Sequence, residues 1–446
     1  MHAGPREHHW QGKDAAMLFS LGVNYWPRRS AQAMWELFDG GEIREDFARI
    51  AGFGLDTVRF FLRWDAFAPQ IDFVDPVMLD RLETVVTLAG DAGLRAMPTL
   101  FCGHMYGVNW LPAWAVDRTT PSGRYRTITG AGESPFGCAN IYTGPLLDAQ
   151  LALARAAGER LRGHPALASW DIGHRFSSVR EPSHAKVTAG EHSQAPADER
   201  LVAQWSRRLT EALQSTAPTP VTAGTFSGDL LFDHDIRLAS LCAPFAFASM
   251  QGDSVCMAFA RNRLDPEALP FLAMLTAAFS FKPVLITGLG NPTCPPNKFS
   301  AFERFALPGE SPNLTISPND SVFATYPCLT ERESAAYCTS VLERLHADGR
   351  LGAYWSGWSD YAETLGAGPP FDEAPHTRSF GIVRSDGSEK PVAAALAAFA
   401  RQRRTVVAPN DMPMIASAYY YRTLPSSTLT LYDAFLRFVD ERRNAM

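Results

Sequence analysis

The feature that most constrains the fold is a regular alternation of apolar, β-prone segments with segments of helical periodicity. In the helical segments, apolar residues recur every three or four positions, as at 42–54, 145–161, 198–213 and 266–279. The β-prone segments lie at 18–27, 57–64, 95–102, 166–173, 220–226, 238–250, 283–288 and 351–358. Alternating strands and helices indicate a parallel sheet, and eight strands are the number that closes a barrel. The sequence therefore predicts an α/β protein with a (β/α)8 TIM barrel.

Local signals mark where several of these helices begin. Asp75 followed by Pro76 places a capping side chain before a proline at the first helical position. Thr330 and Glu333 have the spacing of a capping box, in which each side chain bonds the backbone N–H of the other residue. We expect helices to begin at both places.

The predicted organisation is an N-terminal tail at 1–17, a barrel at 18–405 and a C-terminal extension at 406–446. The extension contains an amphipathic helix that we expect to pack on the outside of the barrel. Two long connections, 175–197 and 289–329, follow the fourth and seventh strands. Connections of this length are uncommon unless they are functional or disordered. Both would lie at the carboxyl ends of the strands, where barrel active sites are found.

Composition restricts the partners. The net charge is −6 and no basic run is present, which argues against a nucleic-acid partner. No apolar segment is long enough for a signal peptide or a membrane span, so we expect a soluble cytoplasmic protein without a membrane partner. The seven cysteines are scattered and predict free thiols. His104 and His174, with Asp171 or Cys102, lack the spacing of a ligand set, so no metal and no cofactor are expected.

Two predicted strand ends carry a family resemblance. The fourth strand contains Trp170 and is followed by His174 and Arg175, and the seventh reads Ile-Thr-Gly-Leu-Gly around Gly288. Together these segments resemble retaining glycoside hydrolases of the family 5 clan, which includes cellulases and mannanases. The likeness covers about residues 18–400. It implies that His174 stands at the position of a sugar-binding Asn, Arg175 at that of the acid/base Glu and Gly288 at that of the nucleophilic Glu.

These replacements remove the chemistry that the resemblance would imply. Retaining hydrolysis needs two carboxyl groups about 5 Å apart. The guanidinium of Arg175 stays protonated and cannot act as an acid, and Gly288 has no side chain. We therefore expect no retaining glycosidase activity.

The resemblance also implies a set of strand-end residues that contact sugar. Gln251 would replace a His of the family at the end of the sixth strand. From the residues alone, the arginine could merely pair with an acid, and the tryptophans could be core residues. The predicted substrate-binding set is Arg59, Trp64, His104, Asn109, Trp110, Gln251 and Trp355.

Three functions stay open at this level. The first is a catalytically impaired protein that binds a carbohydrate or acts as the partner of an active glycosidase; the fork of Arg175 makes an acidic sugar the better candidate ligand. The second is an active hydrolase or transglycosidase that uses relocated carboxylates. The third is a structural interaction protein with a vestigial pocket. The candidate relocated carboxylates are Asp65, Glu181, Asp253 and Asp360.

Overall fold

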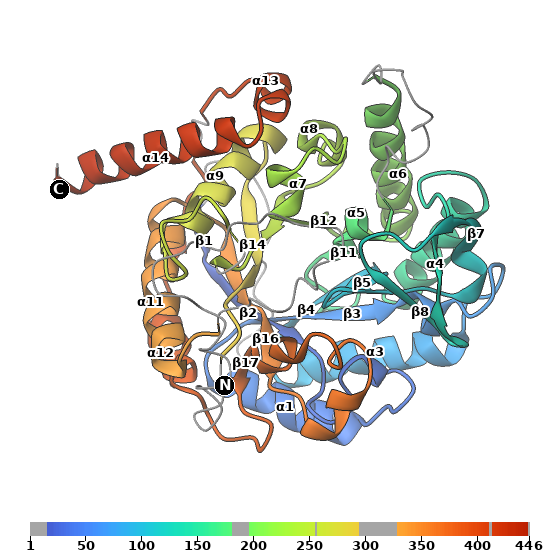
Figure 1. The fold of residues 1–446 in the computed structure, drawn as a ribbon. Helices are drawn as coiled ribbons and strands as arrows, with labels where there is room; N and C mark the ends of the chain where they lie inside the picture. Colours follow the sequence, from blue (N-terminus) through green and yellow to red (C-terminus); the bar gives the residue numbers. More distant parts are fainter. Residues whose placement is uncertain (1–15, 181–195, 255–256, 294–327, 410–412, 445–446) are drawn as a thin grey trace.

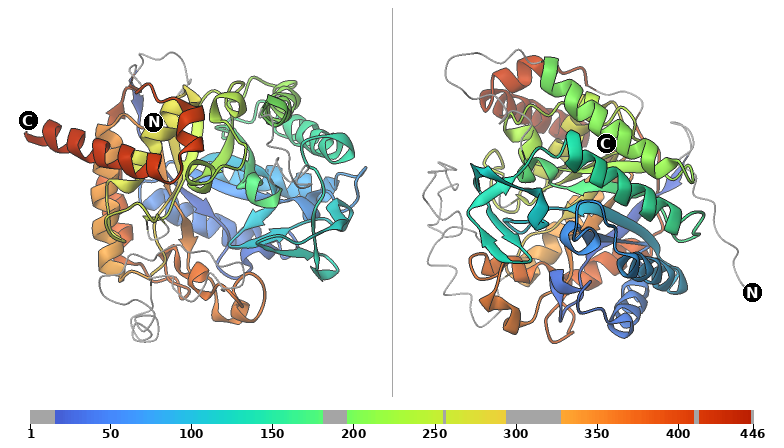
Figure 2. Two further views of the ribbon diagram at one scale, coloured as in Figure 1. Left: turned by 45° about the horizontal axis from the view of Figure 1, so that its top comes forward. Right: turned by 90° about the vertical axis from the view of Figure 1, so that its right-hand side faces the viewer.

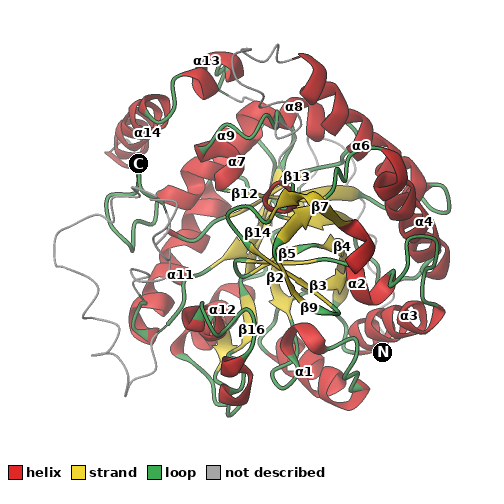
Figure 3. Ribbon diagram, turned by 45° about the vertical axis from the view of Figure 1, so that its right-hand side comes forward, coloured by secondary structure: helices red, strands yellow, loops and turns green. Residues whose placement is uncertain are grey.

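The protein is a closed barrel of eight parallel strands surrounded by helices, as predicted (Figures 1 and 3). The computed structural model describes residues 16–180, 196–254, 257–293, 328–409 and 413–444. Neighbouring strands follow one another in the sequence, and the last pairs with the first. The barrel strands are β2 (Ser20–Tyr25), β3 (Thr57–Arg63), β4 (Arg95–Cys102), β11 (Trp170–His174), β12 (Val221–Phe226), β13 (Ala248–Gln251), β14 (Val284–Leu289) and β15 (Gly352–Trp355).

Helices form a ring around the strands (Figure 3). Both predicted start signals are confirmed, since Asp75 caps the second helix of the ring and Thr330 with Glu333 forms a capping box on a later one. The main helices are α1 (Gly40–Gly52), α3 (Pro76–Asp91), α4 (Gly144–Arg160), α6 (Pro196–Gln214), α9 (Ala268–Ser280), α11 (Glu331–Ala347) and α12 (Pro391–Ala400). Within the described residues, none of the helices is long and apolar enough to cross a membrane.

The prediction of one long strand at 238–250 is wrong. Only its end forms β13, whereas Leu238–Leu241 is the short helix α8. Leu238 and Leu241 are both buried. Residues three apart lie on one face of a helix but on opposite faces of a strand, so a helical turn is the conformation that buries both side chains.

Other predicted strands are shorter in the structure. The fourth begins at Trp170, and Leu167 before it makes only an isolated bridge with Ala96. The first is divided, because β1 (Met17–Leu18) pairs with β18 (Thr405–Val406) outside the barrel before β2 begins.

The connection after β4 has the length that the sequence indicated but is more structured than expected. Residues 103–143, which we call the β4 insert, form six short strands in two small sheets beyond the end of β4 (Figure 1). Strands of two to six residues carry too little periodicity to be recognised in a sequence. They are β5 (His104–Met105), β6 (Val108–Trp110), β7 (Val116–Pro121), β8 (Arg126–Thr129), β9 (Gly132–Ser134) and β10 (Phe136–Cys138).

Most of the two connections predicted to be long lies outside the described residues. For the first, the structure describes α5 (Phe176–Val179) and Arg180 before the gap at 181–195. For the second, the undescribed part is 294–327.

The end of the chain packs against α9. It forms α13 (Ser417–Arg422) and α14 (Ser426–Asn444), and α14 runs along the outside of the barrel with its C-terminal end projecting from it (Figures 1 and 2). The ring of Tyr432 lies 4.9 Å from that of Phe271, and its hydroxyl donates to Asp265 at 2.6 Å. Two further tyrosine hydroxyls, from Tyr420 and Tyr421, donate to the backbone of α7 (Gly228–Leu231).

The barrel closes where β15 meets β2, and this seam requires a glycine. A Cβ at Gly352 would lie 2.2 Å from the backbone oxygen of Ser20. Backbone in the middle of a closed sheet cannot move away without disturbing its hydrogen bonds, so the clash cannot be relieved by a rotamer change.

We expect Gly352→Ala to lower the free energy of unfolding by about 1–3 kcal/mol or more, because it overpacks this seam. Gly52→Ala, at the exposed end of α1 where a Cβ meets nothing within 4 Å, is the matched control and should be neutral or slightly stabilising. Urea denaturation measures both, and equal stability of the two variants would contradict this account of the seam.

Candidate functional site

The predicted site residues lie at the carboxyl ends of the barrel strands. Neighbouring strands bring Gln251 opposite Gly288 and Leu289 opposite Trp355. His174 is the last residue of β11 and pairs with Gly224 of β12. Because all eight strands are parallel, these positions share one face of the barrel, which is the face used by barrel active sites.

A buried ion pair crosses the barrel interior beneath this face. Arg59 donates to Asp171 from Nε at 3.0 Å and from Nη2 at 2.5 Å, and both side chains are fully buried. Nη1 donates to the amide oxygen of Asn24 at 3.1 Å. Burial raises the pKa of the Asp171 carboxyl, while the charge and hydrogen bonds of Arg59 oppose this shift. Arg59, predicted to contact sugar, has no exposed surface and binds a carboxylate of its own chain.

His174 joins this network as a neutral acceptor. Its Nδ1 lies 3.3 Å from both Arg59 Nη2 and Gln251 Nε2. A guanidinium can only donate, so Nδ1 carries the lone pair and the proton is on Nε2. Burial, followed by the charges of Arg59 and Arg175, holds the pKa of His174 well below its usual value. His174 therefore orients Gln251 and stays uncharged.

Arg175 directly follows β11 in a left-handed backbone conformation, with φ 49° and ψ 44°. Its N–H donates to the carbonyl oxygen of Gly224 at 3.0 Å, which ties the turn to β12. The guanidinium lies over the ring of Phe226 at 4.8 Å. Among the described residues, no carboxylate forms an ion pair with it. Arg175 thus presents a positive charge at a strand end.

The space beside Gly288 is occupied by Gln251. A Cβ at position 288 would lie 2.7 Å from Gln251 Cβ and 3.3 Å from its Oε1. A larger side chain at this position therefore requires a smaller one at 251, so the two residues fit each other.

His104 and Asn109 form a second polar pair, within the β4 insert. Asn109 Nδ2 donates to the carbonyl oxygen of Ser178 at 3.3 Å, which leaves its Oδ1 to accept from His104 Nδ1 at 2.8 Å. Burial and the positive charges of Arg175 and Arg124 lower the pKa of His104 to about 3. The ring of Tyr125 packs edge-on against the imidazole at 4.4 Å. This pair joins the insert to the segment after β11.

The three predicted tryptophans are nearly buried. Trp64 packs edge-on against Trp114 at 5.1 Å, and Trp110 lies beneath the guanidinium of Arg63 at 5.1 Å. Trp355 donates from Nε1 to the carbonyl oxygen of Phe380 at 2.8 Å and is 1% exposed. In this conformation the three rings support strand ends and loops and offer little open surface to a ligand.

The candidate carboxylates have different surroundings. Asp65 accepts from Arg63 Nε at 3.0 Å, and Asp360 accepts from Lys390 Nζ at 2.6 Å, so both belong to ion pairs. Asp253, just beyond β13, is partly exposed; burial raises its pKa to about 6 although the charge of Arg175 opposes the shift. Glu181 lies outside the described residues.

Some site residues were missed by the sequence analysis. Asp171 was considered only as a metal ligand, although an acid inside an apolar strand requires a buried cation, and the arginine in Val-Arg-Phe of β3 supplies it. Tyr106, which has a φ of 54° and whose hydroxyl lies 3.1 Å from that of Tyr361, carried no recognisable signal.

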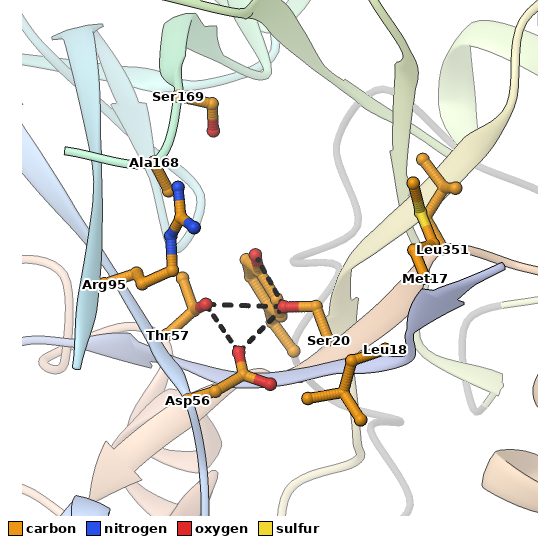
Figure 4. Close-up of a pocket in the computed structure, with 10 residues that line it drawn as sticks. Met17, Leu18, Ser20, Asp56, Thr57, Arg95, Ala168, Ser169 and Leu351 are labelled. Atoms are coloured by element: carbon orange, nitrogen blue, oxygen red, sulfur yellow. Dashed lines mark hydrogen bonds between the residues drawn. The ribbon is translucent and has the colours of Figure 1, made fainter. Parts of the chain in front are cut away.

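Two cavities lie at opposite ends of the barrel. One, of about 240 Å³, lies between the β4 insert and the residues after β11 and β12, and includes Asn109, Arg124, Arg180 and Phe226 in its wall. The other, of about 80 Å³, lies at the amino-terminal ends of the strands (Figure 4). There Asp56 accepts from Ser20 and Thr57 at 2.9 and 2.6 Å, so its polar groups bond one another. The larger cavity is therefore the better candidate binding site.

The fold is similar to that of several solved glycosidase structures. A GH5_18 variant from Streptomyces cattleya in complex with Manb1-4GlcNAc has a TM-score of 0.70 at 18% identity, over 95% of this chain and 92% of that one. GH5_18 from the same organism in complex with GlcNAc has a TM-score of 0.66 at 19% identity, over 90% and 83% of the two chains.

An exo-beta-1,4-mannosidase from Opitutaceae bacterium strain TAV5 has a TM-score of 0.66 at 22% identity, over 87% of this chain. The present chain spans 60% of the length of that mannosidase chain. No protein-family model and no curated protein sequence matches the chain. At these identities the likeness establishes the (β/α)8 fold.

Breaking the interior ion pair should be costly. We expect Arg59→Met to lower the free energy of unfolding by about 3–5 kcal/mol, because Asp171 would remain buried without its partner. The double variant Arg59→Met with Asp171→Leu should lose less than the sum of the two single changes. Arg160→Met, which breaks an exposed pair with Asp80, should cost at most about 1 kcal/mol. Additive losses at 59 and 171 in urea denaturation would refute the coupling.

The pKa of Asp253 predicts a pH dependence. A carboxyl whose pKa is about 6 in the folded protein and about 4 in the unfolded chain binds more protons when folded between these pH values. Its contribution to stability is therefore lost as the pH rises from about 4 to 6.

Asp253→Asn should reduce the fall in unfolding free energy between pH 4 and 7 by on the order of 1–2 kcal/mol, allowing for its partial exposure. Asp46, whose pKa is also about 6, remains in both proteins and cancels in the comparison. Asp91→Asn, at the exposed end of α3, is the control and should leave the pH profile of the unmodified protein unchanged. An identical profile for Asp253→Asn would contradict the raised pKa.

Proposed function

We propose that this protein is a glycoside hydrolase-like barrel that binds a carbohydrate without performing retaining glycoside hydrolysis. The observation that carries the proposal is the pair of residues at the ends of β11 and β14. Arg175 has no proton to transfer at a working pH, and Gly288 has no nucleophile. A retaining mechanism needs a carboxyl group at both positions, about 5 Å apart.

The surroundings of these two positions support the proposal. Gln251 fills the space in which a side chain at 288 would begin. His174 is held by Arg59 and Gln251 and is neutral, so it is bonded within the protein where the family would present a sugar-binding Asn. The neighbours of positions 174 and 288 therefore fit the residues present there. This fit favours a site that has changed as a whole over one that has lost a single catalytic residue.

The class of ligand rests on the fold and on the charge of the site. Two neighbours of this fold, at 18–19% identity, bind Manb1-4GlcNAc and GlcNAc, which supports a carbohydrate as the ligand. Among the described residues no carboxylate forms an ion pair with the guanidinium of Arg175, and such a group favours a sugar that carries a carboxylate or a phosphate over a neutral one.

One observation favours the alternative of an active hydrolase with relocated acids. Asp253 is partly exposed and has a pKa of about 6, as a general acid requires. Asp65 and Asp360 are held in ion pairs, however, so neither is free to serve as its partner. Two other roles were open: partner of an active glycosidase, and structural protein with a vestigial pocket. Nothing in the described residues favours either of them over ligand binding.

The test is activity together with its restoration. The purified protein should not hydrolyse aryl β-mannosides, aryl β-glucosides or β-mannan oligosaccharides. Turnover in the usual enzyme range of roughly 1–1000 per second would overturn the proposal. In that case the effect of Asp253→Asn on the rate distinguishes relocated acids from another mechanism.

The restoring variant combines Arg175→Glu, Gly288→Glu and His174→Asn with Gln251→Gly, because the new side chain at 288 would lie 2.7 Å from the Cβ of Gln251, which any residue but glycine would keep. It should release an aryl leaving group slowly but measurably, since two carboxyl groups would then face each other. The matched control carries Gln in place of each introduced Glu and should be inactive. If the restoring variant folds and its two carboxyl groups lie more than about 10 Å apart in a crystal structure, the assignment of both positions is wrong.

A further inference from the structure

The larger cavity is built from three connections that are far apart in the sequence. Arg124 and Tyr125 come from the β4 insert, Arg180 follows α5, and His234 belongs to the segment after β12, whose last residue, Phe226, also lines the cavity. Its volume of about 240 Å³ is below the roughly 300–1000 Å³ of pockets for drug-sized ligands, so it suits a ligand as small as one sugar unit.

Positive charge predominates around this cavity. Among the described residues, neither Arg124 nor Arg180 forms an ion pair with a carboxylate. Arg124 lies over the ring of Tyr125 at 5.4 Å, and the Nη1 of Arg180 is 3.4 Å from the carbonyl oxygen of Cys138. Arg175, over Phe226, adds a third guanidinium beside the wall.

Two described carboxylates on which these arginines act electrostatically, Asp117 and Asp229, are hydrogen-bonded to other groups. Asp117 accepts from the backbone and hydroxyl of Thr119 at 2.9 and 2.7 Å. Asp229 is buried and accepts from the hydroxyl of Ser177 at 2.6 Å and from the N–H of Phe226 at 3.0 Å. Neither carboxylate therefore neutralises the arginines by direct contact. The pKa of His104 is lowered mainly by burial, and the positive charges of Arg175 and Arg124 lower it further. This is consistent with a positive potential around the cavity.

The wall combines this charge with the groups that hold a sugar ring. Guanidinium forks match the geometry of carboxylate and phosphate oxygens and bind them through charge-assisted hydrogen bonds. Tyr125, Phe226 and Phe232 supply aromatic surface for the apolar face of a sugar. Asn109 and Ser178 add polar atoms to the wall, and the amide of Asn109 is held by its hydrogen bond to the carbonyl oxygen of Ser178.

We propose that this cavity binds the anionic group of an acidic carbohydrate, a carboxylate or a phosphate, and that Arg124 and Arg180 are its direct contacts. The inference rests on the proposed function in one respect only, namely that the ligand is a carbohydrate. Arg175, whose guanidinium stacks on Phe226, adds to the positive potential, whereas Arg124 and Arg180 make the hydrogen bonds.

The experiment is calorimetric titration of the full chain at low salt with four probes: mannose, glucuronic acid, mannose 6-phosphate and inorganic phosphate. Glucuronic acid or mannose 6-phosphate should bind more tightly than mannose, and the tighter of the two identifies the anionic group. Arg180→Gln and Arg124→Gln should each lower the affinity for the acidic probe by about tenfold or more, since a hydrogen bond to a charged group is lost.

The control variant is Arg44→Gln, which removes the same charge from an exposed position on α1 and should leave every affinity unchanged. Arg180→Lys keeps the positive charge but loses the paired N–H donors of the guanidinium. Its affinity for the acidic probe should therefore lie between those of Arg180→Gln and the unmodified protein. Thermal unfolding of each variant shows that it is folded. Raising the salt from 50 to 300 mM should weaken acidic probes and not mannose.

The outcomes separate the two proposals. The anion site is overturned if folded Arg124→Gln and Arg180→Gln bind both acidic sugars as tightly as the unmodified protein does. If mannose binds in that case, the proposed carbohydrate-binding function still stands. Binding of inorganic phosphate that both variants weaken, with no gain from any sugar, supports the anion site and overturns the carbohydrate function. Failure of all four probes to bind overturns both.

Discussion

The buried ion pair between Arg59 and Asp171 is the interaction on which the interior of the barrel depends. Transferring two charges from water into a protein interior costs several kcal/mol per ion, and only close contact with further hydrogen bonds offsets it. Asp171 obtains these bonds from Arg59, from the hydroxyl of Thr99 at 3.3 Å and from the N–H of Gly173 at 3.1 Å. Gly224 leaves the space for the pair, since a Cβ there would lie 3.1 Å from Arg59 Nη2. The network continues through Asn24, which donates to the carbonyl oxygen of Thr287 at 2.9 Å, and so extends from β3 to β14.

This network also determines which groups are available to a ligand. His174 Nδ1 is bonded to Arg59 Nη2 and to Gln251 Nε2 beneath the strand ends, so these three atoms are already engaged within the protein. A ligand would have to break these bonds before it could use them, and an unsatisfied buried group costs about 1–3 kcal/mol. Among the described residues, Arg175, at a strand end, and Arg124 and Arg180, on connections, form no ion pair with a carboxylate. The proposed binding therefore relies on arginines and not on carboxylates.

The same arrangement connects the two proposals. A positive group beside a carboxyl lowers its pKa and keeps it ionised, which is unfavourable for a general acid. Arg175 acts on Asp253 in this way, although burial prevails and its pKa is about 6. A site with three guanidinium groups near the strand ends favours anionic ligands over the two-carboxyl chemistry of retaining hydrolysis. The two proposals, absence of retaining hydrolysis and affinity for anions, are thus two aspects of the same charge distribution.

Local patterns in the sequence were enough to identify the barrel, the caps at Asp75 and Thr330, and the strand ends at which Arg175 and Gly288 lie. Each depends on residues within a few positions of one another, where periodicity and capping report directly on backbone conformation. The helical turn at 238–241, the β4 insert and the ion partner of Arg59 depended on tertiary structure. The last of these lies 112 residues away in the sequence, and the arginines at 124 and 180 meet only because two connections fold over the same strand ends. Which side chains meet across a barrel is decided by long-range packing and by the cost of burying an unpaired charge, and neither is expressed in a local pattern.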